Sequence, residues 1–219
     1  MPIINIDEES YDKLYKFIDK SFFIQLFQKI KYRTIFPILL LAKRDKSIID
    51  IGCAKGNFLR FLKSHGFSNL SGLDIKNCLY EDLLNNVTFY EKSICTEQFD
   101  LNTKFDNVIV QNMLHHVPVD KLETTAVNLS NLLKEGGILF IHEPNMGSII
   151  GRFMHQYFLK FYPELQKATM KEKNEQFAFC AAWPNFIKNL KDKGIIPMKE
   201  SNYSFYKVFI GRKLYRKNL

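Results

Sequence analysis

Apolar side chains recur at two different spacings along the chain, and the spacing predicts which element forms where. From residue 8 to residue 43 they recur at helical spacing, with Leu14, Ile18 and Phe22 on one face, so we expect two helices there. Beyond residue 46 they gather in short runs of strand length, separated by helical stretches up to the fifth run. The expected strands lie near residues 47–51, 69–73, 87–90, 106–110, 138–142, 196–202 and 205–211.

This order of elements predicts the fold class. Alternating strands and helices favour a mostly parallel sheet with right-handed crossovers, and the close spacing of the last two strands predicts an antiparallel pair. We therefore expect an α/β fold in which helices flank a sheet of seven mostly parallel strands. With 219 residues, of which 46% are apolar, the chain is expected to form a single domain. Its parts are an N-terminal helical cap (1–45), a core (46–145), a helical insertion (146–183) and a C-terminal helix with the strand pair (184–219).

The insertion at 146–183 is longer than the connection between the fifth and sixth strands requires. Residues 184–193 supply a crossover helix by themselves. The insertion is aromatic at its start, for example at Phe153 and Tyr157, and charged in its middle, which predicts a helical pair with one apolar face. Two interpretations stay open, namely a lid whose aromatic side chains line a substrate pocket, and helices that only pack on the core.

The most informative segment is the turn between the first predicted strand and the helix after it. Gly52 and Gly56 lie in this turn, and Asp74 ends the second predicted strand. Glycine lets the backbone lie against a ligand, and a carboxylate about twenty residues further on accepts both hydroxyl groups of a ribose. The turn lacks the G-x-G-x-x-G spacing that binds a pyrophosphate. The segment therefore predicts a site for another ribose-bearing cofactor.

This segment resembles the first motif of the Rossmann-like, class I S-adenosylmethionine-dependent methyltransferases. The motif is matched by Asp50, Gly52, Cys53 and Gly56, and Ala54 stands where the family usually has a glycine. The resemblance implies S-adenosyl-L-methionine as cofactor and S-adenosyl-L-homocysteine as product. It further implies that the turn holds the methionine part of the cofactor and that Asp74 binds its ribose.

Two later segments resemble small-molecule members of the family in the same order. Residues 105–118 (FDNVIVQNMLHHVP) contain a buried strand that ends at Gln111 and Asn112. Residues 132–145 (LLKEGGILFIHEPN) predict a helix end, a turn at Gly136 and Gly137, and a strand that closes with His142, Glu143 and Asn145 at the same crevice. The cofactor positions that the resemblance adds are Ile75, Ser93, Ile94, Gln111 and Asn112. Ser93 stands where the family commonly has an acid that binds the adenine amine.

The candidate catalytic residues are His115, His116 and Glu143. An unperturbed imidazole has a pKa of about 6.5, which suits a general base. If a helical turn begins at Met113, two adjacent histidines cannot both face one site, so at most one is catalytic. We assign the role to His115, and the alternative is a histidine that only orders the loop. Glu143 would orient a hydroxyl or amine of the substrate, or cap the helix that follows its strand.

Charge and cysteine spacing limit the partners. The formal net charge of +8 comes mostly from lysine, which favours an anionic partner or reflects genomic base composition. The four cysteines lack the spacing of a zinc site or a disulfide framework, and paired metal-binding acids are absent, so we expect no metal. The start of the chain does not read as a secretory signal, and no run approaches the roughly eighteen apolar residues of a membrane span. We expect a cytoplasmic protein without a transmembrane segment, and contact with a membrane surface stays open.

Three functions agree with these observations. The leading hypothesis is a methyltransferase acting on a small-molecule, possibly anionic, acceptor, at an oxygen of a saccharide, phosphorylated metabolite or lipid-linked precursor. The second is an RNA or protein methyltransferase. The segment QNMLHH differs from the N/D-P-P-Y/F string of many base-methylating enzymes and no RNA-binding module is visible, so nucleic acid is the less favoured partner. The third is an inactive cofactor-binding subunit. The sequence does not give the oligomeric state.

Overall fold

The computed structural model describes residues 44–149, 152, 166–202 and 206–214. The two helices expected within 8–43 and the aromatic start of the insertion, including Phe153 and Tyr157, lie outside the described residues.

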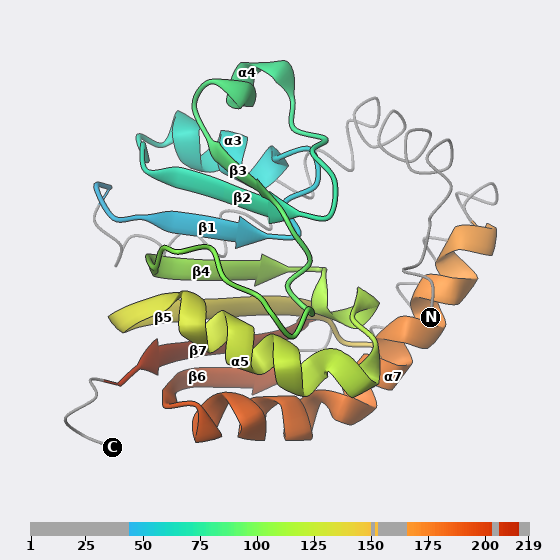
Figure 1. The fold of residues 1–219 in the computed structure, drawn as a ribbon. Coiled ribbons are helices and arrows are strands. Elements are labelled where there is room, and N and C mark those ends of the chain that lie inside the picture. The colour runs from blue at the N-terminus through green and yellow to red at the C-terminus, as the bar shows by residue number, and fades with distance from the viewer. Residues whose placement is uncertain (1–43, 150–151, 153–165, 203–205, 215–219) are drawn as a thin grey trace. The chain divides into compact units, whose positions relative to one another are not determined.

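The described residues form a seven-stranded sheet in the order β3-β2-β1-β4-β5-β7-β6 (Figure 1). The first five strands are mutually parallel, and β7 lies antiparallel between β5 and β6. The predicted class, the parallel core and the antiparallel pair are therefore confirmed. The strands are β1 (Ile48–Ile51), β2 (Leu70–Asp74), β3 (Thr88–Glu91), β4 (Phe105–Gln111), β5 (Leu133–Pro144), β6 (Ile195–Asn202) and β7 (Tyr206–Lys213).

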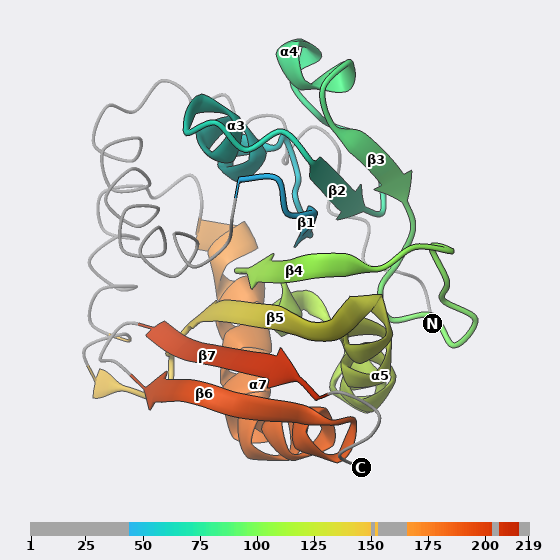
Figure 2. The same cartoon turned by 90° about the vertical axis from the view of Figure 1, so that its left-hand side faces the viewer.

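Two helices cover the same face of the sheet and enclose the main core. In Figures 1 and 2, α5 and α7 lie side by side against β5, β7 and β6. Phe179, Trp183 and Phe186 of α7 are all buried there against apolar side chains of β4 and β5. The helical elements are α3 (Asn57–Ser64), α4 (Glu81–Leu84), the 3-10 turns η1 (Leu114–His116) and η2 (Val119–Lys121), α5 (Leu122–Leu132) and α7 (Gln166–Asp192). No described helix combines the length and the apolar character that a membrane crossing requires.

Strand β1 lies inside the sheet, between β2 and the central strand β4. All of its residues are buried, as expected for a parallel strand covered on both faces. It pairs with β2 on one side and with β4 on the other, so the strand order reverses between β1 and β4. Ligands of open α/β sheets bind outside the carboxyl ends of the strands at such a reversal.

The predicted turn at Gly136 and Gly137 is wrong. Helix α5 ends at Leu132, Leu133 is already extended, and both glycines lie inside β5. Gly136 has a φ of 76°, and the pairing of β4 with β5 shifts register near this point. A Cβ on Gly137 would lie 2.9 Å from the carbonyl oxygen of Lys134. The two glycines therefore form an irregularity within the strand, as in a β-bulge, and do not separate it from the helix.

The predicted boundary between insertion and crossover helix at 183/184 is also wrong. Helix α7 runs without a break from Gln166 to Asp192, with Pro184 inside it. A proline in a helix interior removes one backbone hydrogen bond, which is why the sequence favoured a helix start there. Burial of Phe179, Trp183 and Phe186 on both sides of Pro184 keeps the helix continuous. Its N-terminal half, which the sequence places in the insertion, lies near the turn after β4 in Figure 1.

Candidate active site

The glycine turn after β1 adopts the left-handed backbone that its composition predicts. Gly52, Ala54 and Gly56 have φ values of 72°, 48° and 81°. Ala54, which stands where the family usually has a glycine, keeps the backbone that a glycine would adopt. The turn is fixed to the next strand, because the backbone N–H groups of Gly52 and Cys53 both donate to the carbonyl oxygen of Leu73, at 2.8 and 3.2 Å.

The two glycines also allow close packing at the reversal of strand order. A Cβ on Gly52 would lie 2.3 Å from Cγ of Met113, and one on Gly56 would lie 2.5 Å from Cδ1 of Leu83. Met113 follows β4, and Leu83 belongs to α4. The turn therefore brings β1, the end of β4 and α4 together, and side chains at either position would separate them.

Asp74 joins the end of β2 to this turn. Its Oδ2 accepts a hydrogen bond from the backbone N–H of Ala54 at 2.8 Å, and its Oδ1 accepts one from Ile75 at 2.7 Å. Burial raises the pKa of Asp74, while these two N–H groups and the nearby charge of His116 oppose the rise. Each oxygen keeps a second lone pair for a ligand donor. The side chain of Ile75 is 57% exposed, which offers an apolar surface beside the carboxylate.

The end of β4 carries an acceptor without a partner. The Oε1 atom of Gln111 is buried and makes no hydrogen bond. Asn112 adopts a left-handed φ of 50°, and its N–H donates to the carbonyl oxygen of His142 at 2.9 Å. Because buried polar atoms are usually paired, Gln111 marks a position that suits a donor from a ligand. Asp50 and Cys53 are buried beside this region, and burial raises the pKa of the Cys53 thiol well above its usual range.

Ser93 and Ile94 follow β3, beside the end of β2. Ser93 Oγ lies 3.0 Å from Sγ of Cys95. The carbonyl oxygen of Ile94 accepts a hydrogen bond at 2.7 Å from Asn128 Nδ2, which also donates to Thr96. Asn128 belongs to α5 and is buried, so a helix remote in sequence fixes this loop. Nothing in the local pattern around Asn128 indicates that contact.

Glu143 binds the turn after β4. Its Oε1 accepts hydrogen bonds from the backbone N–H groups of Met113 and Leu114, both at 2.9 Å, and its Oε2 lies 2.7 Å from Nδ1 of His115. The side chains of His115 and Glu143 are 1% and 0% exposed. Glu143 therefore caps η1, whereas the sequence suggested a cap on the helix after β5.

His116 points to a different partner. Its Nδ1 lies 2.9 Å from Oε2 of Glu175 on α7, and the two side chains are 42% and 21% exposed. The rings of His115 and His116 lie 4.1 Å apart between centroids. The expectation that adjacent histidines cannot both face one site agrees with this geometry, because one ring is buried and the other is accessible. Glu175 was not among the predicted site residues, since it belongs to a charged stretch with no motif.

His142 and Glu143, which the sequence placed in one crevice, contact different parts of the structure. The His142 ring lies 4.1 Å from the Tyr206 ring between centroids, tilted by 35°, whereas Glu143 hydrogen-bonds the backbone of η1. Successive strand residues point to opposite faces, so His142 and Glu143 do not share one crevice. Within the described ranges, no three His, Cys, Asp or Glu side chains are grouped as metal ligands.

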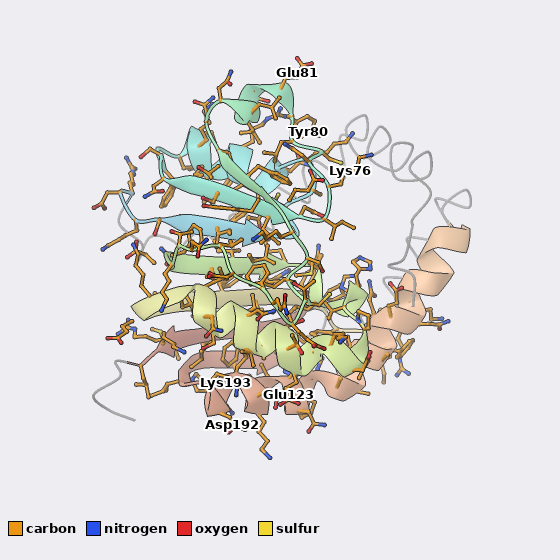
Figure 3. The ribbon with its side chains drawn as sticks, viewed as in Figure 1. Lys76, Tyr80, Glu81, Glu123, Asp192 and Lys193 are labelled. Carbon is orange, nitrogen blue, oxygen red and sulfur yellow. The ribbon has the colours of Figure 1, made fainter. Side chains whose placement is uncertain are left out.

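The surface beside the glycine turn is concave. A surface hollow of about 560 Å³ is lined by residues including Lys55, Arg60 and Tyr80. Tyr80 lies next to α4, at the end of the molecule remote from Glu123 and Asp192 (Figure 3). Arg60 stacks on the Tyr80 ring at 3.9 Å and hydrogen-bonds Asp82. Its charge is thus already paired, and the residues that line the hollow come from the glycine turn, α3 and residues 78–82, with none from the end of β4.

Comparison with known proteins identifies the family. The sequence profile of the methyltransferase domain matches residues 24–191, which is most of the chain. The chain belongs to the class I S-adenosylmethionine-dependent methyltransferases. No curated protein sequence matches it significantly.

Solved methyltransferase structures share the fold of this methyltransferase. A putative S-adenosylmethionine-dependent methyltransferase from Methanococcus maripaludis matches with a TM-score of 0.68 and 13% identity, covering 100% of this chain and 99% of its own. The magnesium protoporphyrin IX methyltransferase ChlM of Synechocystis PCC 6803, with bound S-adenosylhomocysteine, matches at 0.59 and 16%, covering 94% and 95%. The N-methyltransferase NodS of Bradyrhizobium japonicum WM9 matches at 0.59 and 15%, covering 86% and 97%.

The residues of this methyltransferase fit the cofactor of the family, S-adenosylmethionine. The open turn at 52–56, the carboxylate of Asp74 and the exposed side chain of Ile75 lie at consecutive strand ends. Gln111 adds a buried acceptor that lacks a donor. These are groups of the kinds that an amine, a ribose and a purine require.

Proposed function

We propose that this methyltransferase methylates an oxygen atom of a small-molecule acceptor and that His116 takes the proton of the acceptor hydroxyl. The observation that carries the proposal is the imidazole–carboxylate pair of His116 and Glu175, which is accessible and whose imidazole lies in η1, directly after Met113, the residue that packs on the glycine turn. A hydroxyl group is a poor nucleophile until its proton is removed, so a base at this position serves an oxygen acceptor.

The cofactor is held by the ends of β1, β2 and β4 in this proposal. The turn at 52–56 lies against its methionine part, Asp74 accepts the ribose hydroxyls, and Ile75 packs on the adenine. Ser93 and Ile94 border the adenine, and Gln111 and Asn112 face the amino acid part. When bound, S-adenosylmethionine supplies a methyl group that moves to the acceptor oxygen as its bond to sulfur breaks and the electron pair stays on sulfur.

His115 supports the site without touching the acceptor. Its side chain is buried and its Nδ1 is occupied by Glu143. A general base must reach the proton that it removes, either directly or through one water. We therefore assign proton removal to the accessible His116 and assign to His115 and Glu143 the fixing of the turn that carries it.

The comparisons support a small acceptor. ChlM is named for a porphyrin substrate. NodS is named as an N-methyltransferase, so the fold by itself does not favour an oxygen acceptor. A neutral amine needs no base before it attacks, and the imidazole–carboxylate pair is the reason for preferring oxygen here.

Transfer of labelled methyl groups from S-adenosylmethionine into a fractionated cell extract tests this proposal. We expect label in the small-molecule fraction and, with the isolated acceptor, a decrease in kcat of about 10²- to 10⁴-fold for His116→Asn. The matched control is His65→Asn, a histidine at the end of α3, which should keep the wild-type rate. Label confined to RNA or protein would reject the small acceptor. A His116→Asn rate equal to that of the control would reject the base.

A further inference from the structure

We propose that Glu175 is a positioning residue for the reaction, which holds His116 with its proton on Nδ1 and its Nε2 free to accept the acceptor's proton. This inference rests on the proposed function, in which His116 is the base. Glu175 belongs to α7, 59 residues from His116 in sequence.

The tautomer follows from the chemistry of the two groups. An ionised carboxylate only accepts hydrogen bonds, and a neutral imidazole has one donor and one acceptor nitrogen. The Nδ1 atom of His116 lies 2.9 Å from Oε2 of Glu175, so Nδ1 carries the hydrogen. The hydrogen bond made by one ring nitrogen thereby sets the state of the other, and Nε2 keeps its lone pair.

The same carboxylate stabilises the product of proton transfer. When the acceptor hydroxyl gives its proton to Nε2, the ring becomes a cation with hydrogen on both nitrogens. Glu175 then faces a full positive charge through an existing hydrogen bond, as the acid of a hydrolytic triad does. Both side chains are partly exposed, so solvent screens the interaction and the gain is moderate.

The packing of α7 explains why Glu175 lies at this point. Glu175, Phe179 and Trp183 are spaced by four residues and share one face of the helix. Phe179 and Trp183 are almost fully buried in the core beneath β4 and β5. Glu175 lies one helical turn before Phe179 on this same face of α7, where the helix has passed the apolar core and reaches η1. The helix is continuous through Pro184, so one rigid element links the core to the base.

A structural ion pair would produce the same distance, and two kinds of variant separate the alternatives. Glu175→Gln keeps an amide oxygen that accepts from Nδ1, whereas Glu175→Leu removes the acceptor. If Glu175 positions the ring, Glu175→Gln retains the tautomer and Glu175→Leu loses it. A purely structural role predicts a less stable Glu175→Leu whose kcat is unchanged, even if the tautomer shifts.

The tautomer of His116 is measured by nitrogen-15 NMR of the full chain labelled at histidine, at about pH 9 where imidazole is neutral. We expect hydrogen on Nδ1 in the wild type and in Glu175→Gln, and a mixed population in Glu175→Leu. The expected decrease in kcat is about three- to tenfold for Glu175→Leu, with an unchanged dissociation constant for S-adenosylhomocysteine. The matched control is Glu97→Gln, which breaks an exposed pair with Lys121.

The outcomes are distinct. An unchanged tautomer in Glu175→Leu overturns the inference. A changed tautomer with an unchanged kcat, while His116→Asn is slow, overturns it as well and leaves the base in place. If His116→Asn is as fast as wild type, the proposed function has failed, and the positioning role fails with it. Retained binding of S-adenosylhomocysteine by each variant shows that it folds.

Discussion

The carboxylate of Asp74 is bound by the protein backbone and is also the proposed partner of the cofactor's ribose. Two backbone N–H groups, from Ala54 and Ile75, hold its oxygens in place. Burial nevertheless raises its pKa, so the ionised form is kept at a cost to the folded chain. A ribose that donates two hydrogen bonds to the carboxylate favours the ionised form. Binding of the cofactor and ionisation of Asp74 are therefore coupled.

We expect this coupling to appear in the pH dependence of affinity. As pH falls toward 5, the dissociation constant for S-adenosylhomocysteine should rise, because protonation of Asp74 begins above the ordinary aspartate pKa of about 3.9. Asp74→Asn should weaken binding at neutral pH by about 1.5–3 kcal/mol, roughly 10- to 150-fold, and remove the pH dependence. Titration calorimetry measures both, with the exposed Asp82→Asn as control. Equal affinity of Asp74→Asn and wild type would contradict the assignment.

Single residues were predictable from sequence where their role is local. The left-handed backbone of the turn at 52–56 was predictable from its glycines, and Ala54 adopts a left-handed φ of 48° as well. Glu175 and Asn128 were not predictable, because each acts on a loop that lies 59 or at least 32 residues away in the chain. No periodicity or spacing records such a contact, and only the packing of α7 and α5 creates it.

Among the elements, the turn after β4 depends on the neighbouring strand. Glu143 of β5 holds η1 through two backbone N–H groups and one imidazole, all of them largely withdrawn from water. A sequence pattern places Glu143 at a strand end but does not say which loop it binds. The two wrong element boundaries have the same origin. By local rules, Gly136 with Gly137 should interrupt a strand and Pro184 should end a helix. Pairing with β4 keeps β5 continuous through the glycines, and burial keeps α7 continuous through the proline.

Removing the Glu143 carboxylate should lower the stability of the folded chain. We expect Glu143→Ala to lower the free energy of unfolding by about 3–5 kcal/mol, because it removes the buried carboxylate that binds the N–H groups of Met113 and Leu114 and the ring of His115. Urea denaturation measures the change, and Glu135→Gln, an exposed substitution on the same strand, should stay within about 0.5 kcal/mol of wild type. Stability of Glu143→Ala equal to that control would show that Glu143 acts on the substrate alone.

At the scale of the whole sheet, the candidate site lies at the carboxyl ends of β1 and β4, and a cluster of hydrogen bonds around Asp106 lies at the opposite ends of these strands. Asp106, near the start of β4, accepts hydrogen bonds from Ser47 N at 3.0 Å, Ser47 Oγ at 2.7 Å and Lys134 Nζ at 2.8 Å. These contacts join β1, β4 and β5 at their other ends. Burial alone would raise the pKa of Asp106, but the hydrogen bonds from Lys134 and Ser47 lower it well below its usual range.

The low pKa of Asp106 predicts how stability responds to acid. A depressed pKa contributes stability above the unfolded value of about 3.9, and this contribution is lost as pH falls through the folded value. At pH 7, Asp106→Asn should therefore cost about 1–2 kcal/mol, and the difference from wild type should shrink steadily below about pH 4. Urea unfolding of both proteins across that range measures it. A difference that is constant with pH would contradict this origin, and affinity for S-adenosylhomocysteine should be unaffected because the site lies at the other edge.

The reversal of strand order between β1 and β4 has a consequence for how such a chain diversifies. The residues proposed for the cofactor come from β1, β2, β3 and the end of β4, while β5, β7 and α7 form the other half of the sheet, next to the proposed base His116. We expect substitutions on the second side, apart from Glu143, which holds the turn after β4, to change acceptor preference more than affinity for the cofactor. Such a chain can keep the same methyl donor while its acceptor changes.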